Sequence, residues 1–421
     1  MALRRLLLDV APLRSSPPFR RLWIGQTLSG FGSQLTAVAV MFQVWRTTGS
    51  PVWTGAVGLA QVIPLVAFGF FAGSLADRAD RRTVYLVMTG GQAGCALLLA
   101  LQTLLDRPPI VGVLLLVAAQ AACAAGAGPV SRAVLPCLLP RHELAAGLAL
   151  RQLSFQGAML VGPALGGLIV SGAGAGACYA IDAVTFGAVF LGALGLPQTP
   201  AGDGPARPGA SGILDGLAFL AGTPVVRGAL LTDLATTVLS MPISLFPLIN
   251  SERFGGDPRT LGLFLTAVAA GGVTASLFSG VFTRLARPGL LTLAASAVWG
   301  GALMLFGMSS RPWWGFALLA LAGAADTVSV VARGTIVQTH TPARLLGRVA
   351  AAEQVVGQAG PELGNLRGGL VAGATTGTTA LVSGGLLCLA AVTAVAIRTP
   401  GLRRSPAPLS PSAAPAVPEC G

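Results

Sequence analysis

The chain has 421 residues, of which 53% are hydrophobic and only 10% are charged, and its mean hydropathy is +0.75. A soluble domain usually carries about 25% charged residues, so this composition excludes an ordinary soluble protein. The net charge of +12 comes from 27 basic residues, all of them arginine, that gather in short loops between apolar runs, which argues for a membrane-orientation signal and against nucleic-acid binding.

Apolar runs of about 20 residues, long enough to cross the hydrocarbon core of a bilayer as a helix, recur along the whole chain. The sequence therefore predicts an all-α integral membrane protein. Gly, Pro and Arg punctuation divides the runs into twelve spans, at residues 22–45, 53–76, 83–104, 110–134, 147–171, 177–196, 225–249, 260–282, 289–308, 313–336, 347–372 and 377–397.

The arginines predict how these spans are oriented. Most of them fall in the N-terminal tail, in the loops after even-numbered spans and in the C-terminal tail. By the positive-inside rule, these segments lie in the cytoplasm. We therefore expect a multi-pass protein of the cell membrane with both termini cytoplasmic. The arginines assigned to the opposite loops are Arg46, Arg107, Arg253, Arg259 and Arg311.

The two halves of the chain resemble each other. GAGPVSRAVLPCLLPRHELAAG, near residue 126, is similar to GAADTVSVVARGTIVQTHTPARLLG near residue 323, and GPALGGLIVSG is similar to GPELGNLRGGLVAG, at a constant offset of about 200 residues. Such parallel repeats are typical of transporters. The expected units are an N-terminal tail (1–21), a six-helix bundle (22–196), a cytoplasmic linker (197–224), a second six-helix bundle (225–397) and a disordered tail (398–421).

The sequence does not suggest catalysis or a bound cofactor. His142 and His340 are isolated in loops, and the six cysteines have no metal-ligand spacing. No GxxxxGK[ST] loop is present, which argues against an intrinsic ATPase. We expect no enzyme activity, no metal and no cofactor, and a monomer whose partners are a small-molecule substrate, protons and membrane lipid.

The loop GSLADRADRR, between spans 2 and 3, concentrates charge in a chain that has little. It resembles the loop signature of the major facilitator superfamily, which is a glycine, then Asp-Arg, then further basic residues. Gly73, Asp77, Arg78, Arg81 and Arg82 match this pattern. The resemblance implies a conformational latch in which Asp77 meets the start of the eleventh span and closes the cytoplasmic side. The alternative is a simple orientation signal, which needs only the arginines.

The latch predicts a specific effect of Asp77→Asn. Losing a carboxylate that faces a helix N-terminus removes about 1–2 kcal/mol from the state closed to the cytoplasm. The equilibrium then shifts roughly five- to thirty-fold toward the inward-open form. Cysteines on the cytoplasmic side of the cleft should label faster and those on the outer side slower. Unchanged labelling on both sides would leave only the orientation role.

The fifth span contains GAMLVGPALGG, whose small residues allow helices to approach closely in lipid and whose proline bends the helix. The string resembles the signature associated with exporters of the superfamily, and a purely structural packing seam is the alternative. The residues concerned are Gly157, Gly162, Pro163, Gly166 and Gly167.

Charged residues inside spans are costly, which makes them candidates for proton coupling or substrate binding, although each could also be a structural pair. Asp233 and Glu362 lie deepest and are the first choices for protonation. Asp326 and Arg333 share a helix face about 10 Å apart, so each is expected to meet another helix. Drug antiporters of the superfamily carry an arginine in the fourth span, where this chain has Gln120. The remaining candidates are Asp182, Glu353 and Arg367.

The order of motifs is most similar to the enterobactin-exporter branch of the superfamily, on the stretches PPFRRLW, GSLADRADRR, ARPGLLTLAAS and VQTHTPARLLGRV. The resemblance implies a proton-driven exporter, an antiporter using alternating access, whose cargo is siderophore-like or drug-like, as in multidrug resistance. The alternatives are an importer of a small metabolite and a transport-inactive membrane receptor or assembly protein.

Overall fold

The computed structural model describes residues 10–78, 80–105, 108–140, 142–196, 210–278, 287–342 and 345–404. Within these ranges the chain is helical apart from caps and short turns, and it forms no β-strand. Of Gly73, Asp77 and Arg78 only the helical backbone is described, and the side chain of Arg81 also lies outside the description.

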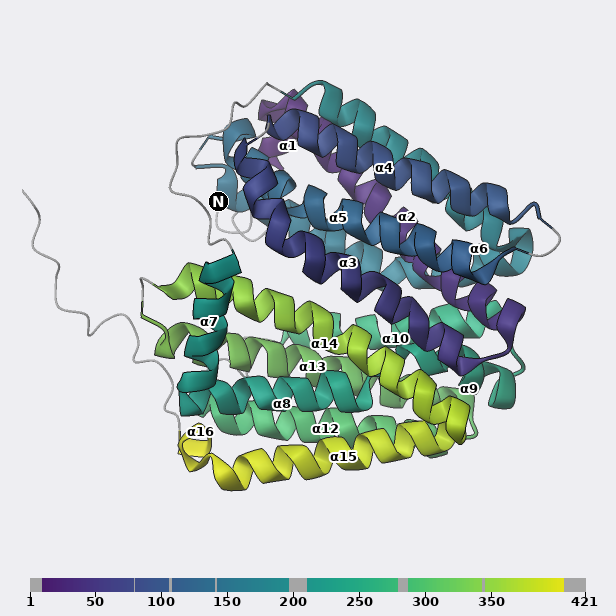
Figure 1. Cartoon of the computed structure of the whole chain (residues 1–421), viewed down its shortest axis with the longest axis vertical. Coiled ribbons are helices and arrows are strands. Elements are labelled where there is room, and N and C mark those ends of the chain that lie inside the picture. Colours follow the sequence, from purple (N-terminus) through teal and green to yellow (C-terminus); the bar gives the residue numbers. More distant parts are fainter. Residues whose placement is uncertain are drawn as a thin grey trace, which may run out of the picture.

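The expected spans lie on described helices, except that the last residues of the eighth span, 279–282, lie outside the described residues (Figure 1). Eight helical segments in the described ranges are long and apolar enough to cross a membrane. The helices of the first half are α1 (Ala11–Ser15), α2 (Pro17–Thr48), α3 (Pro51–Arg78), α4 (Arg81–Gln102), α5 (Ile110–Leu138) and α6 (Leu144–Leu194).

The second half begins with α7 (Ala210–Gly222), which precedes the seventh span. Short helices η2 and α9 complete that span, and α16 follows the twelfth. The helices are α7, α8 (Pro224–Ser240), η2 (Ile243–Leu245), α9 (Phe246–Arg253), α10 (Pro258–Leu277), α12 (Pro288–Met308), α13 (Pro312–His340), α14 (Leu346–Ala374), α15 (Gly377–Arg398) and α16 (Pro400–Arg404).

Local sequence sets the helix ends. The Ser16 hydroxyl accepts a hydrogen bond from the Phe19 amide at 3.3 Å and caps α2, whose first helical residue is Pro17. The same helix ends at Gly49, which adopts a left-handed conformation with φ of 58°. Asp80 caps α4 by accepting a hydrogen bond from the Thr83 amide at 3.1 Å. Polar caps thus separate the apolar runs.

The fifth and sixth spans form one helical run, α6, that folds back on itself at Gly174. This residue has φ of 81° and ψ of 171°, which is accessible to glycine because it lacks a side chain. Both ends of α6 lie beside the start of α2, since Gly147 approaches Phe19 and Gly192 approaches the Arg21 backbone. The two arms are therefore antiparallel.

The seventh span, predicted as one continuous helix over 225–249, is broken between α8 and α9. Met241 is extended, with ψ of 123°, because the ring of Pro242 disfavours the helical conformation of the residue before it and has no N–H to continue the helix. The Asn365 side chain accepts a hydrogen bond from the Ser244 amide at 3.1 Å, and the Ser244 hydroxyl donates to the Asn365 carbonyl at 2.7 Å. These contacts satisfy polar groups that the break exposes.

The helices form two bundles, drawn from the two halves of the chain, as expected for the fold class (Figure 1). Contact across the bundles runs chiefly along α3 against α14 and α6 against α10. Glycines permit both crossings: a β-carbon on Gly55 would lie 2.8 Å from the Asn365 carbonyl, and one on Gly167 would lie 2.5 Å from the Pro258 carbonyl. Both crossings lie at the end of the molecule that carries the 49–50 and 254–257 turns; we call it the closed end.

A cluster of aromatic rings supports the closed end from the second bundle. Phe264 on α10 packs against Phe246 on α9 with ring centroids 5.4 Å apart, and against Phe306 on α12 at 5.5 Å. All three rings are buried. Tilted and edge-on pairs of this kind add to the stabilisation from burying the rings. They fix α9 and α10 where α10 meets α6.

Candidate functional site

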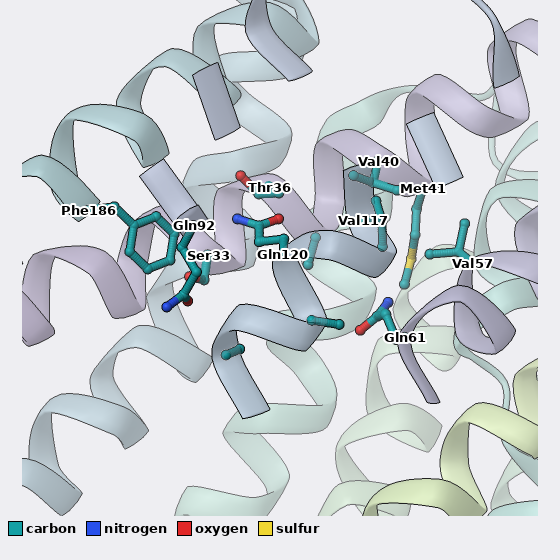
Figure 2. Close-up of a pocket in the computed structure, with 13 residues that line it drawn as sticks. Ser33, Thr36, Val40, Met41, Val57, Gln61, Gln92, Val117, Gln120 and Phe186 are labelled. Atoms are coloured by element: carbon teal, nitrogen blue, oxygen red, sulfur yellow. The ribbon is translucent and has the colours of Figure 1, made fainter. Parts of the chain in front are cut away.

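A cavity of about 220 Å³ with a mainly apolar wall and several polar groups lies among α2, α3, α4, α5 and α6 of the first bundle (Figure 2). Its polar lining consists of neutral groups, the amides of Gln61, Gln92 and Gln120 and the hydroxyls of Ser33 and Thr36. Apolar residues complete the wall. In Figure 2 the Phe186 ring lies beside Gln92, and Met41 and Val57 lie at the other end beside Gln61.

A second cavity of about 370 Å³ adjoins the first. Ser33, Gln92, Ala124 and Phe186 line both, so these residues form the partition between them. Ligand cavities for small molecules usually measure about 300–1,000 Å³. The two cavities together fall within that range.

Hydrogen bonds organise the second cavity. The Gln26 amide donates to the Tyr85 hydroxyl at 2.9 Å and to the Ser131 hydroxyl at 2.8 Å, which joins α2, α4 and α5. Arg151 on α6 donates to the Ser131 hydroxyl at 3.1 Å and to the Ser131 carbonyl at 3.3 Å. This cavity is therefore the more polar of the two and has a guanidinium in its wall.

Sequence reasoning named Gln120 but none of the other polar residues that line the cavities. A signal was available, because polar residues recur on one face of two apolar helices at spacings of three and four. On α2 and α4 these residues are Gln26, Ser29, Ser33, Thr36, Tyr85, Thr89 and Gln92.

Asp182, on the second arm of α6, lies behind the wall of the first cavity and is 0% exposed. Its Oδ2 accepts hydrogen bonds from the Thr36 hydroxyl at 2.8 Å and from the Gln120 amide at 3.2 Å. Its Oδ1 is buried and has no hydrogen-bond partner. Thus Gln120 on α5 binds a carboxylate on another helix.

In the second bundle, Arg333 on α13 joins two carboxylates from neighbouring helices. It forms an ion pair with Asp233 of α8, and its Nε lies 3.5 Å from Glu353 Oε1 of α14. Asp233 and Arg333 are 6% and 7% exposed, so the pair is buried. Buried pairs are costly to break, because the remaining charge has lost its partner. Arg333 does not pair with Asp326 of its own helix, which is partly buried.

Glu362 and Arg367 lie on α14. Glu362 faces α3, where a β-carbon on Gly58 would lie 2.7 Å from its Oε2, and that oxygen accepts a hydrogen bond from Asn365 at 3.2 Å. Glu362 therefore belongs to the contact between the two bundles. Arg367 donates instead to the Leu239 carbonyl at the end of α8.

The glycines of the fifth span pack against two different helices. Gly162 faces Gln34 and Gly166 faces Val38, both on α2, whereas Gly167 faces α10. The Pro163 carbonyl lies against Gly262 of α10. Gly157, farther along, has the Phe31 ring at ordinary contact distance. The first arm of α6 therefore lies between α2 of its own bundle and α10 of the other bundle.

The latch proposed for Gly73, Asp77, Arg78 and Arg81 concerns side chains outside the described residues. Arg82 is described, and its guanidinium donates a hydrogen bond to the Leu194 carbonyl, at the end of α6, at 2.6 Å. As for metal ligands, no group of three or more His, Cys, Asp or Glu side chains comes together in the part of the chain that the structure describes.

Comparisons with known proteins agree with this architecture. The enterobactin exporter EntS of Shigella boydii and that of Escherichia coli are each 30% identical to this chain over 392 residues, or 91% of this chain and 92% of the exporter. Two solved structures share the fold: the nucleoside transporter NupG (TM-score 0.70, 14% identity, 91% and 98% coverage) and a bacterial homolog of the human lysosomal transporter Spinster (0.67, 16%, 94% and 97%).

The model of a family described as transmembrane secretion effector matches residues 8–417, nearly the whole chain. With the helical fold and the relatives above, this match identifies the chain as a multi-pass membrane transporter. The chain belongs to the transmembrane secretion effector family of the major facilitator superfamily.

Proposed function

We propose that the protein is a secondary active exporter that moves a siderophore-like or drug-like small molecule out of the cytoplasm by alternating access, as a proton antiporter. The observation that carries this proposal is the cavity within the first bundle, whose mainly apolar wall carries several amides and hydroxyls, combined with bundle-to-bundle glycine contacts at one end of the molecule. A cavity between helices whose bundles meet at one end suits a cycle in which access alternates.

The arginines favour loading from the cytoplasm. The closed end carries the turn at 49–50, whereas the start of α2, the end of α3 and the start of α4, with their neighbouring arginines in the sequence, lie toward the opposite end. Under the positive-inside rule the closed end then faces outward. We therefore place the protein in the cell membrane with both termini in the cytoplasm, as a monomer.

The cavity lining favours a cargo that is aromatic or apolar in its body and rich in hydrogen-bonding groups. Neutral amides and hydroxyls can both donate and accept, and Phe186 and Met41 offer apolar contact. The function after which the relatives are named, enterobactin export, supports a siderophore-like molecule. Import of a small metabolite and a transport-inactive receptor are the competing functions, and no structural contact described above favours either.

Proton coupling requires a carboxyl group that binds and releases protons inside the spans. Asp182, Asp233, Asp326, Glu353 and Glu362 are the candidates, and Arg367 is a candidate for binding substrate. Asp77 with its neighbouring arginines remains the proposed latch between states.

Everted membrane vesicles test the direction and the coupling. The cargo is first identified as the metabolite that accumulates in the cytoplasm of a deletion strain and disappears from its medium. Vesicles with an acidic interior should then accumulate that metabolite, and a protonophore should stop them. Accumulation that does not depend on the proton gradient contradicts proton coupling, and accumulation by right-side-out vesicles contradicts export. As an orientation control, a cysteine at position 203 should react with an impermeant reagent in everted vesicles and not in intact cells.

A further inference from the structure

The carboxyl group of Asp182 has two oxygens in different surroundings. Oδ2 is held by Thr36 from α2 and Gln120 from α5. Oδ1 lies beside Gly32 of α2, where a β-carbon would come within 2.6 Å of it, and it has no hydrogen-bond partner. The Thr185 hydroxyl also lies beside Gly32 and donates to the Asp182 carbonyl at 2.8 Å. Glycine at position 32 leaves room for Asp182 Oδ1 and for the Thr185 hydroxyl oxygen, because any side chain there would overlap both atoms.

No cation compensates this carboxyl group among the described residues. The ion pairs found there involve other carboxylates, and the groups that face Asp182 are the Thr36 hydroxyl, the Gln120 amide and the Cys178 thiol of its own helix. From α4 and α10, which also pack against α6, no described charged side chain comes within ion-pair distance. An ionised carboxylate buried without a cation is very costly, so a bound proton is the simplest companion for Oδ1.

The other candidate carboxylates are engaged differently. Asp233 has an arginine partner, and Glu353 lies near the same arginine. Glu362 sits in the contact between the bundles and is bonded to Asn365. Asp326 lies close enough to Asp233 and Arg333 to interact with both of their charges. In contrast, Asp182 is fully buried and accepts hydrogen bonds from two residues, Thr36 and Gln120, that line the first cavity.

We propose that Asp182 is the proton-binding site of the transporter and that Thr36 and Gln120 link its protonation to the cargo cavity. This inference rests on the proposed function and names the residue that performs its coupling step. With a proton on Oδ1 the group is neutral, and Thr36 and Gln120 are held only weakly. When the proton returns to water the group carries a charge of −1, and both side chains are drawn to Oδ2 and away from cargo. Proton and cargo thereby affect each other's binding.

The test measures the proton directly and requires neither cargo nor transport. The purified protein, reconstituted in liposomes, is titrated from acidic to alkaline pH while infrared difference spectra record the C=O stretch of protonated carboxyl groups. We expect a titrating band that is absent from Asp182→Asn and displaced in frequency in Asp182→Glu. The same band should persist in the matched controls Glu362→Gln and Asp326→Asn. Its survival in Asp182→Asn overturns the proposal.

The link to the cavity is tested with Gln120→Leu, which removes a donor to the ionised form. The midpoint of the band should move toward alkaline pH by about one unit. An unchanged midpoint overturns the link, and a band that responds to sodium but not to pH overturns the proton site. If Asp182→Asn does not fold, the Gln120→Leu titration and the displaced band of Asp182→Glu decide. A normal titration without acid-driven uptake in vesicles would reject only the proposed function.

Discussion

Replacing Arg333 with methionine is expected to lower the free energy of unfolding by about 3–5 kcal/mol, because it leaves Asp233 buried beside Glu353 without a cation. The loss should appear as a lower midpoint of thermal unfolding in detergent and as a smaller monodisperse fraction. Adding Asp233→Asn to Arg333→Met should recover part of the loss, because the buried charge is then removed together with its partner.

The chain offers a matched control for this experiment. Arg348 also forms an ion pair with an acidic residue on a neighbouring helix, since its Nη1 lies 2.9 Å from Asp215 Oδ2 of α7. The side chains of Arg348 and Asp215, however, are 47% and 56% exposed. Exposed pairs contribute at most about 1 kcal/mol, so Arg348→Met should be nearly neutral. Equal losses from Arg333→Met and Arg348→Met would contradict the assignment of the Asp233–Arg333 pair as a buried structural element.

Gly262→Ala is expected to shift the conformational equilibrium away from the state in which the two bundles meet at the closed end. A β-carbon at this position would overlap the Pro163 carbonyl, and overpacking of this kind typically costs about 1–3 kcal/mol. Since 1.4 kcal/mol is a factor of ten, the population should shift roughly five- to more than a hundredfold. The measurement is the labelling of a cysteine at Met41, in the first cavity, by an impermeant reagent added from outside.

Gly187→Ala serves as the control, because a β-carbon there meets nothing within 4 Å. Alanine also favours a helix over glycine by about 1 kcal/mol, so this variant should be neutral or slightly stabilising. Faster labelling in Gly262→Ala alone supports the crossing of α6 and α10 as the outer closure. Unchanged labelling together with a lower thermal midpoint would mean that the crossing stabilises both states equally.

The sequence predicted the helices well because long apolar runs and their punctuation act locally. Span positions follow from hydropathy and from caps such as Ser16 and Asp80. The break in the seventh span was not predicted, although Pro242 lies within it, because an apolar run with a proline can also continue as a kinked helix. Only the distant Asn365 shows how polar groups freed by the break are satisfied.

The candidate site was harder to predict, because side chains that contact each other across helices have no fixed separation in the sequence. The sequence identified Asp182, Asp233 and Arg333 as unusual, but their depth in an apolar run did not reveal which would be paired. Asp233 and Glu362 ranked first for protonation, and the structure gives Asp233 an arginine partner and Glu362 an amide partner, Asn365. Asp182 depends on Thr36 and Gln120, which lie 146 and 62 residues away in the chain.

The interrupted seventh span has a mechanical consequence. Besides its bonds to Asn365, Ser244 accepts a hydrogen bond through its carbonyl from the Thr54 hydroxyl of α3 at 2.9 Å. The short η2 segment is thus hydrogen-bonded both to α14 of its own bundle and to α3 of the other bundle. Parting the bundles at this end must break the Thr54 bond while the Asn365 bonds can stay intact. The outer piece of the span would then travel with α14, and Met241 and Pro242 would serve as the joint.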